Sequence, residues 1–232
     1  MGTTNVEFTK LMEYVKHLQA GYKNITYHNK THAADLCQTF NYFLIGGGLR
    51  EKAKMDSIEI LSCLISACMH DYEHPGVNNV FLVNMSDEKA IRHNDISVLE
   101  NHHIAASFDL MLHEKRNWAC NFSPTEFKKI RHLIIETILS TDMTKHFTEM
   151  GHIKSRSTAS DFDTSQGKDK ESIIKFVFHM ADISNPTKSW ELCKLWTDLL
   201  FVEFFAQGDL EKQNDFPVSL FYDRQTTNVA KS

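Results

Sequence analysis

Apolar residues recur at helical spacing along nearly the whole chain, and this periodicity constrains the fold more than any other feature. The 232 residues include only 9 glycines and 4 prolines, which is few for the tight turns of a β-sandwich or barrel. Hydrophobic residues make up 42% of the sequence, so a sizeable core can be buried. The sequence therefore predicts an all-α protein, and its length allows one large domain or two small ones.

The apolar pattern and local start and stop signals together predict where the helices lie. A first helix ends before Gly21, and a second ends at the glycine run of residues 46–48. The segment Ser123–Glu126 is a capping box with proline in the first helical position, so a helix begins there and runs towards Leu139. Further helices are predicted over residues 58–68, 96–112, 171–181 and 187–207, with a polar surface loop over residues 151–170.

Charge and composition limit the partners and the location of the protein. Lysine and arginine number 25 against 30 acidic residues, and no basic run is present, so nucleic acid is not expected as a partner. The first residues contain no apolar signal segment, and the longest apolar run, Ile58–Met69, is too short to cross a bilayer. Five cysteines without a C-x-x-C pair fit a reducing compartment. We therefore expect a soluble, cytoplasmic protein without membrane insertion.

Thirteen histidines are the most unusual feature, because several stand at spacings that bring metal-binding groups together. The spaced groups are His28 with His32 on one helix face, His70-Asp71 with His74, Glu100 with His103, and His179 with Asp182. Neutral imidazoles and carboxylates from several elements are the ligands that a divalent metal site needs. Each histidine alone is more often a satisfied surface residue. Their co-occurrence, with His70-Asp71 at the end of an apolar helix, predicts a metal site.

These groups lie within longer segments that carry a family resemblance. The segments are Tyr27–Asp35, His70–Gly76, Asn94–His103, Ser140–Met143, Met180–Lys188, Trp196–Asp198 and Glu203–Asp209. In their residues and in their order along the chain, these segments resemble the catalytic domain of the class I 3',5'-cyclic nucleotide phosphodiesterases. The resemblance is strongest to the calmodulin-stimulated and cAMP-specific branches of that family. The resemblance implies that residues 1–232 form a single compact, multi-helix HD-type domain that is incomplete at both ends.

The resemblance also implies a site with two divalent metal ions, Zn²⁺ in the tighter position and Mg²⁺ or Mn²⁺ in the other. The implied metal ligands are His32, His70, Asp71 and Asp182. The residues implied to orient the water around the second metal are His74, Glu100, His103 and Thr141. His28 is the implied general acid, oriented by Glu203. The implied substrate-binding residues are Tyr27, Met143, Asn185 and Leu200.

The implied activity is hydrolysis of a 3',5'-cyclic nucleotide to its 5'-monophosphate by a metal-activated hydroxide. Asn185 could pair with an adenine ring, which favours cAMP over cGMP; the alternative is that it caps a helix before Pro186. Two alternative functions are possible from the residues. The chain could be another HD-type metal-dependent phosphohydrolase, or it could be an inactive fragment that binds a nucleotide or a metal. The residues identify no regulatory partner.

The chain stops at Ser232, one position before the glutamine that binds the purine ring in the resembling family. Some organisms read the codons UAA or UAG as glutamine, and translating such a gene with the standard code would stop the chain at this position. The alternative explanation is an arbitrary exon boundary. The following family helix would cover apolar surface, worth roughly 25 cal/mol per Å². We therefore expect the 232-residue chain to be prone to aggregation and to have little or no activity.

Overall fold

The structure is a computed structural model that describes residues 5–231, and every regular element within this range is helical. The α-helices are α1 (Phe8–Gly21), α2 (Lys30–Ile45), α3 (Leu49–Lys52), α4 (Ser57–Met69), α5 (Asn79–Asn84), α6 (Glu88–Arg92), α7 (Val98–Leu112), α8 (Pro124–Leu139), α9 (His146–Arg156), α10 (Gly167–Asp182) and α11 (Trp190–Gln213). Short 3₁₀ helices are η1 (Met143–Lys145), η2 (Asn185–Thr187) and η3 (Val229–Lys231). The predicted all-α class is confirmed. Ser232, where the sequence ends, lies outside the described residues.

Side-chain caps fix where the main helices begin. The predicted capping box at α8 is confirmed: the Ser123 side chain accepts from the backbone of Glu126, whose own side chain accepts in return. A second capping box, formed by Asp56 and Glu59, begins α4. At α2 the Asn29 side chain accepts from the backbone N–H of Thr31 at 2.8 Å.

The predicted loop over residues 151–170 is wrong at both of its ends. Helix α9 continues to Arg156 and α10 already begins at Gly167, so only residues 157–166 connect the two helices. Charge pairing stabilises this polar region, because the Arg156 guanidinium donates to Asp169 at 2.7 Å and to Asp161 at 2.8 Å. The sequence analysis missed α3, α5 and α6 for another reason: helices of four to six residues are too short to show a helical period.

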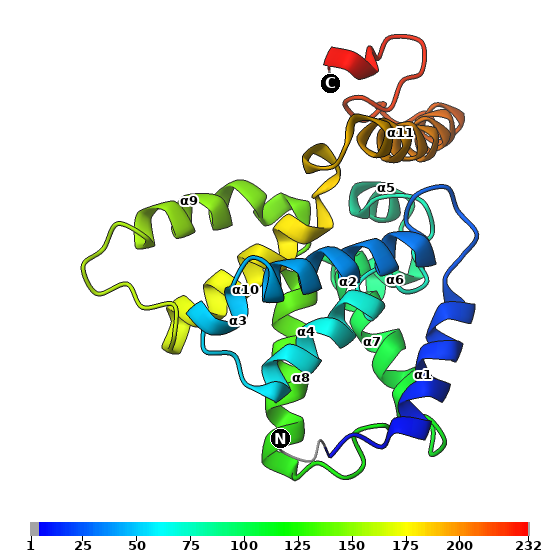
Figure 1. The fold of residues 1–232 in the computed structure, drawn as a ribbon. Coiled ribbons are helices and arrows are strands. Elements are labelled where there is room, and N and C mark those ends of the chain that lie inside the picture. The colour runs from blue at the N-terminus through cyan, green and yellow to red at the C-terminus, as the bar shows by residue number, and fades with distance from the viewer. Residues whose placement is uncertain (1–4, 232) are drawn as a thin grey trace.

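Helix α4 lies between two apolar clusters and belongs to both. One cluster joins its Ile65 and Met69 to α1, α7 and α8, and the other joins its Cys63 and Ala67 to α2 and α10. Figure 1 shows α4 crossing the middle of the molecule between these helices. Because His70 follows directly after this doubly packed helix, the core fixes the position of its last residues.

Helix α11, at 24 residues the longest element, lies at one end of the molecule, and the C-terminal segment follows it there (Figure 1). It buries polar side chains as well as apolar ones, among them Glu203, Gln207 and Glu211. Gln207 accepts from the backbone N–H of Asn78 at 2.8 Å, so a polar contact holds α11 against the segment before α5. No helix of residues 5–231 combines the length and the apolar character that a membrane crossing requires.

We expect the change Phe178→Ala to lower the free energy of unfolding by about 3–5 kcal/mol. The Phe178 ring is fully buried against Phe40, with ring centroids 5.4 Å apart. The matched control is Phe147→Ala, because the Phe147 side chain is 79% exposed and its loss should change stability by no more than about 0.5 kcal/mol. Urea unfolding followed by circular dichroism measures both, and equal losses would contradict the packing described here.

Candidate active site

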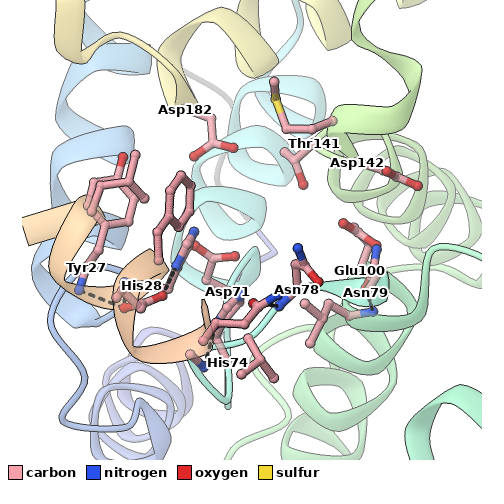
Figure 2. A pocket seen from close by; sticks show the side chains of 18 of the residues that line it. Tyr27, His28, Asp71, His74, Asn78, Asn79, Glu100, Thr141, Asp142 and Asp182 are labelled. Atoms are coloured by element: carbon pink, nitrogen blue, oxygen red, sulfur yellow. Dashed lines mark hydrogen bonds and ion pairs between the residues drawn. The ribbon is translucent and has the colours of Figure 1, made fainter. Parts of the chain in front are cut away.

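The ends of α4 and α10, the start of α2 and the middle of α11 meet at one pocket of about 420 Å³. Every predicted site residue except His70 and Asn185 lines it. Figure 2 shows Tyr27 and His28 on one side of the cavity and Asn79 and Glu100 on the opposite side, with Asp71 between them. The fold therefore brings together residues that are far apart in the sequence, such as Tyr27 and Glu203, which are separated by 176 positions.

The prediction that His28 shares a helix face with His32 is wrong. Asn29 has an extended backbone and caps α2, so the helix begins at Lys30 and His28 precedes it. The cap takes precedence over the four-residue spacing because the Asn29 side chain accepts from one of the free N–H groups in the first turn of the helix. As a result His28 faces α11, whereas His32 faces the end of α4.

His32, His70 and Asp182 form one group that could hold a metal ion. The Nε2 atom of His32 lies 2.9 Å from Asp182 Oδ1 and 3.2 Å from His70 Nε2. His70 donates from Nδ1 to the Ala67 carbonyl at 3.0 Å, so its Nε2 carries the lone pair in the neutral ring. Asp71 Oδ2 lies 3.0 Å from the same Nε2 atom. Lone pairs and carboxylate oxygens that converge in this way fit a divalent cation.

Charge compensation dominates this group. Burial alone would lower the pKa of His70, but the negative charges of Asp71 and Asp182 raise it well above its ordinary value. Burial alone would raise the pKa of each carboxyl, yet the positive charge of His70 holds both pKa values below the ordinary value. The site therefore requires positive charge between its two carboxylates, which protons or a metal cation can supply.

Asp71, His74 and His103 form a second group with ligand atoms within 4.8 Å of one another. His103 donates from Nδ1 to the Tyr72 carbonyl, which leaves an unprotonated Nε2 at 3.8 Å from Asp71 Oδ1. Burial lowers the pKa of His103 to about 4, so this ring is neutral at pH 7. Two acceptors that face each other leave room for a water or a cation between them.

His74 is suited to donate rather than to bind a metal. Its Nδ1 accepts from the backbone N–H of Gly76 at 3.0 Å, so the neutral ring carries its proton on Nε2. Burial and the neighbouring His28 hold the pKa of His74 well below its ordinary value. A neutral ring with one fixed N–H can orient a water or a phosphate oxygen in the pocket.

The far wall of the pocket contains Glu100 and Thr141, together with two residues that the sequence analysis did not select. Asn79 donates to Glu100 at 3.0 Å and accepts from the backbone N–H of Leu99 at 2.8 Å. Asp142 accepts from the buried Ser97 hydroxyl at 2.7 Å. Asp142 lies within the segment Ser140–Met143, which the sequence analysis recognised as a motif. No sequence pattern points to Asn79, because its contacts form only when α7 folds beside it.

Glu100 and Thr141 are held in different ways. Burial raises the pKa of Glu100 to about 7, against the hydrogen bond from Asn79, which lowers it. The Thr141 hydroxyl donates to the Ile138 carbonyl at 2.8 Å, so its oxygen lone pairs stay free for the pocket. Both residues therefore offer oxygen atoms towards the space in front of Asp71.

His28 and Glu203 form a close hydrogen-bonded pair on the near wall. Glu203 is fixed in place because its Oε2 also accepts from the backbone N–H of Tyr27 at 2.9 Å. Burial alone would lower the pKa of His28, but the hydrogen bond to Glu203 and the charge of Asp71 raise it above its ordinary value. The His28 ring stacks on His74 with centroids 4.0 Å apart.

Asn185 is neither a helix cap nor a lining residue. It lies within η2, and its amide donates to the Tyr27 hydroxyl at 2.7 Å, while Tyr27 itself lines the pocket. Met143 and Leu200 line the pocket as well. An aromatic pair that the sequence analysis did not assign, Tyr222 stacked on Phe204 with centroids 4.2 Å apart, completes this wall.

The sequence profile of the 3'5'-cyclic nucleotide phosphodiesterase family matches residues 27–232 of the chain. This chain belongs to that family. Every residue discussed above as part of the pocket lies within the matched range.

Individual relatives support the same assignment. The chain is 42% identical over 211 residues to the dual specificity calcium/calmodulin-dependent 3',5'-cyclic nucleotide phosphodiesterase 1 of Drosophila melanogaster, covering 91% of this chain and 24% of that protein. It is 41% identical to the 1B form of Cricetulus griseus, over 96% of this chain and 41% of that protein. A probable 3',5'-cyclic phosphodiesterase of Caenorhabditis elegans, pde-1, is 38% identical over 100% of this chain and 34% of its own length. The chain thus spans less than half of each of these relatives.

We expect the change His32→Ala to weaken binding of a divalent metal by at least about tenfold, because it removes a buried nitrogen from the group of His32, His70 and Asp182 that could hold the ion. Metal content after gel filtration, measured by atomic absorption, gives the result. His132→Ala is the control, since the side chain of His132 is 57% exposed and pairs with Glu171 instead. Equal metal content in both variants would contradict the assignment.

Proposed function

We propose that the protein hydrolyses 3',5'-cyclic nucleotides to 5'-nucleoside monophosphates. The observation that carries this proposal is the arrangement of the pocket: the His28–Glu203 pair lies on one wall, and the carboxylate–imidazole groups around Asp71 lie beside it. A proton donor beside a metal-binding centre is what hydrolysis of a phosphodiester requires. The names of the relatives, which act on 3',5'-cyclic nucleotides, support the substrate class.

For the metal centre we propose Zn²⁺ held by His32, His70, Asp71 and Asp182, and Mg²⁺ or Mn²⁺ beside Asp71. When bound, the two cations would lower the pKa of a water that attacks phosphorus and would stabilise the phosphate oxygens. His74, His103, Glu100 and Thr141 are proposed to hold the surrounding waters. Mg²⁺ keeps several waters and prefers oxygen ligands, and the free oxygen atoms of Glu100 and Thr141 suit it.

His28 is proposed to protonate the departing 3'-oxygen of the ribose. The Nδ1 atom of His28 pairs with Glu203, so the second ring nitrogen, Nε2, is the one available to the substrate. The hydrogen bond to Glu203 and the charge of Asp71 raise the pKa of His28, which favours the protonated ring that a general acid needs. Glu203 acts through His28, because it fixes the ring and stabilises its positive charge.

For the base we propose that cAMP is preferred and that cGMP is the second substrate. Asn185 supports this order through Tyr27, whose position in the pocket it fixes, and its buried Oδ1 has no partner among residues 5–231. Because Asn185 does not itself line the pocket, this oxygen can accept the exocyclic amino group of adenine only when the base enters beside Tyr27 and the Asn185 side chain turns towards it. The words "dual specificity" in the names of two relatives support the proposal that both nucleotides are substrates.

The change His28→Ala tests the proposed reaction most directly. We expect it to lower kcat by about 10²–10⁴-fold because the leaving oxygen then departs without a general acid. The measurement is steady-state hydrolysis of cAMP with Zn²⁺ and Mg²⁺ present. His28 is outside the proposed zinc ligands, so bound Zn²⁺ should be unchanged, and that control separates a lost proton donor from a lost metal site. Unchanged kcat would contradict the role of His28.

The change Glu203→Gln should move the alkaline limb of the pH–rate profile to lower pH. The hydrogen bond and negative charge of Glu203 raise the pKa of His28, so their loss lowers that pKa. A general acid is active only when protonated, and activity therefore falls at a lower pH than in the unmodified protein. The measurement is kcat/KM for cAMP between about pH 6 and 10, a range that brackets the ordinary histidine pKa. An unchanged limb would exclude His28 as the titrating acid.

The change Asn185→Ala should reduce kcat/KM for cAMP more than for cGMP, by about 10–100-fold in the ratio, if a hydrogen bond to adenine is lost. Competition between the two nucleotides in one assay measures the ratio directly. Tyr27→Phe is the matched variant, because it removes the hydroxyl that Asn185 contacts but leaves the Asn185 amide in place. An equal loss for both nucleotides would limit Asn185 to holding Tyr27.

A further inference from the structure

Ser97, the residue before α7, does not behave as an ordinary helix cap. A serine in this position normally has an extended backbone and accepts from the first turn of its own helix. Ser97 instead has a left-handed backbone, with a φ of 41°, and its side chain makes no cap hydrogen bond to α7. Asn79 supplies that cap from outside the helix, because its Oδ1 atom accepts from the backbone N–H of Leu99. The Ser97 hydroxyl is therefore available to another partner.

The backbone before α7 is unfavourable for the residues that occupy it. Asn94 and Asp95 also have positive φ angles, of 54° and 62°. Residues with side chains adopt this region rarely, mostly at functional sites where surrounding contacts hold them there. The Asn101 amide provides such contacts by donating to the carbonyls of Ile96 at 2.9 Å and Ser97 at 3.1 Å. The chain thus keeps Ser97 in a conformation that α7 itself does not require.

The partner of the Ser97 hydroxyl is Asp142, 45 positions further along the chain. Ser97 donates to Asp142 Oδ2 at 2.7 Å, and both residues are buried. The other carboxylate oxygen, Oδ1, accepts from the backbone N–H of Thr144 at 3.0 Å and from its hydroxyl at 2.7 Å. Because the protein engages both carboxylate oxygens, Asp142 is suited to joining two segments of the chain.

This hydrogen bond links the two segments that carry the oxygen atoms of the far wall. Glu100 lies in the first turn of α7, three residues after Ser97. Thr141 directly precedes Asp142. Figure 2 shows Glu100, Thr141 and Asp142 on the same side of the pocket, which all three line. A buried contact between a hydroxyl and a carboxylate therefore fixes the separation of Glu100 from Thr141.

We propose that Ser97 and Asp142 are positioning residues for the second divalent metal, because their hydrogen bond holds Glu100 and Thr141 at the separation that a hydrated cation needs. The cation is Mg²⁺ or Mn²⁺. Mg²⁺ demands near-octahedral geometry and keeps several waters, so it is sensitive to where the oxygen atoms around those waters lie. This inference rests on the proposed metal centre, in which Glu100 and Thr141 hold the surrounding waters.

Binding of Mn²⁺ to the purified 232-residue chain loaded with Zn²⁺ tests the inference, with free Mn²⁺ measured by electron paramagnetic resonance. We expect Ser97→Ala to raise the Kd for Mn²⁺ about tenfold, as loss of a residue that orients a metal's surroundings does, and to leave the zinc content unchanged. Thr144→Val is the matched control, because it removes the other hydroxyl that donates to Asp142 and keeps the Ser97 contact. Equal shifts in both variants, or no shift in Ser97→Ala, would overturn the proposal.

The variant Ser97→Gly separates the lost hydroxyl from a disturbed fold. Glycine adopts positive φ angles freely, so Ser97→Gly should unfold at a higher temperature than Ser97→Ala. Its affinity for Mn²⁺ should nevertheless fall about tenfold, because the hydroxyl is absent from both variants. Full Mn²⁺ affinity in Ser97→Gly would mean that the backbone at this position, and not the hydroxyl, controls the site, and the proposal would be wrong.

Amide hydrogen exchange examines the same contact without any metal. Ser97→Ala should speed exchange in the first turns of α7, residues 98–104, and also in residues 140–146, to which Ser97 does not belong. Faster exchange in residues 98–104 alone would contradict a link between the two segments. An unmodified chain that binds no Mn²⁺ would instead count against the proposed metal centre, and the exchange rates would still decide whether Ser97 joins both segments.

Discussion

Two carboxylates, Asp71 and Asp182, lie within 3.4 Å of two buried imidazoles, and the arrangement of the molecule depends on compensating their charge. Asp71 follows the C-terminal end of α4, and Asp182 is the last residue of α10. The C-terminal end of a helix carries a partial negative charge from the macrodipole, which disfavours a carboxylate there. Burial adds a further cost. Only positive charge placed between the two helix ends offsets both effects. The convergence of α4 and α10 is therefore unfavourable unless protons or metal cations occupy that position.

This constraint explains why the core is built around α4. The helix packs with α1, α7 and α8 on one face and with α2 and α10 on the other, so its last turn has little freedom to relax away from the opposing charges. Helix α11 differs, because polar contacts from Glu203 and Gln207 hold it against the pocket. The apolar core thus positions the groups that could hold a metal ion, and the site itself contributes to holding α11.

The sequence was informative wherever a local pattern decides the structure. The apolar helix that ends at Met69 placed His70 and Asp71 at a core boundary, and the capping box at Ser123 fixed the start of α8. It failed where long-range contacts or competing local bonds decide. Asn79 acquires a role only when α7 lies beside it, and the pairs of Arg156 with Asp161 and Asp169 stabilise a region whose composition resembles a loop. The roles of the site residues in catalysis were suggested by family resemblance and stay proposals.

Three imidazoles that line the pocket, those of His28, His74 and His103, show how one residue type can serve different purposes. His28 and His74 stack 4.0 Å apart, yet the pKa of His28 is raised and that of His74 is lowered. The difference arises because Glu203 pairs with His28, whereas His74 accepts a backbone N–H and forms no ion pair with a carboxylate among residues 5–231. Burial keeps His103 neutral as well. Neighbouring groups whose pKa values are driven apart can take separate acid and neutral roles, and of these three rings His28 is the one whose surroundings favour the protonated form.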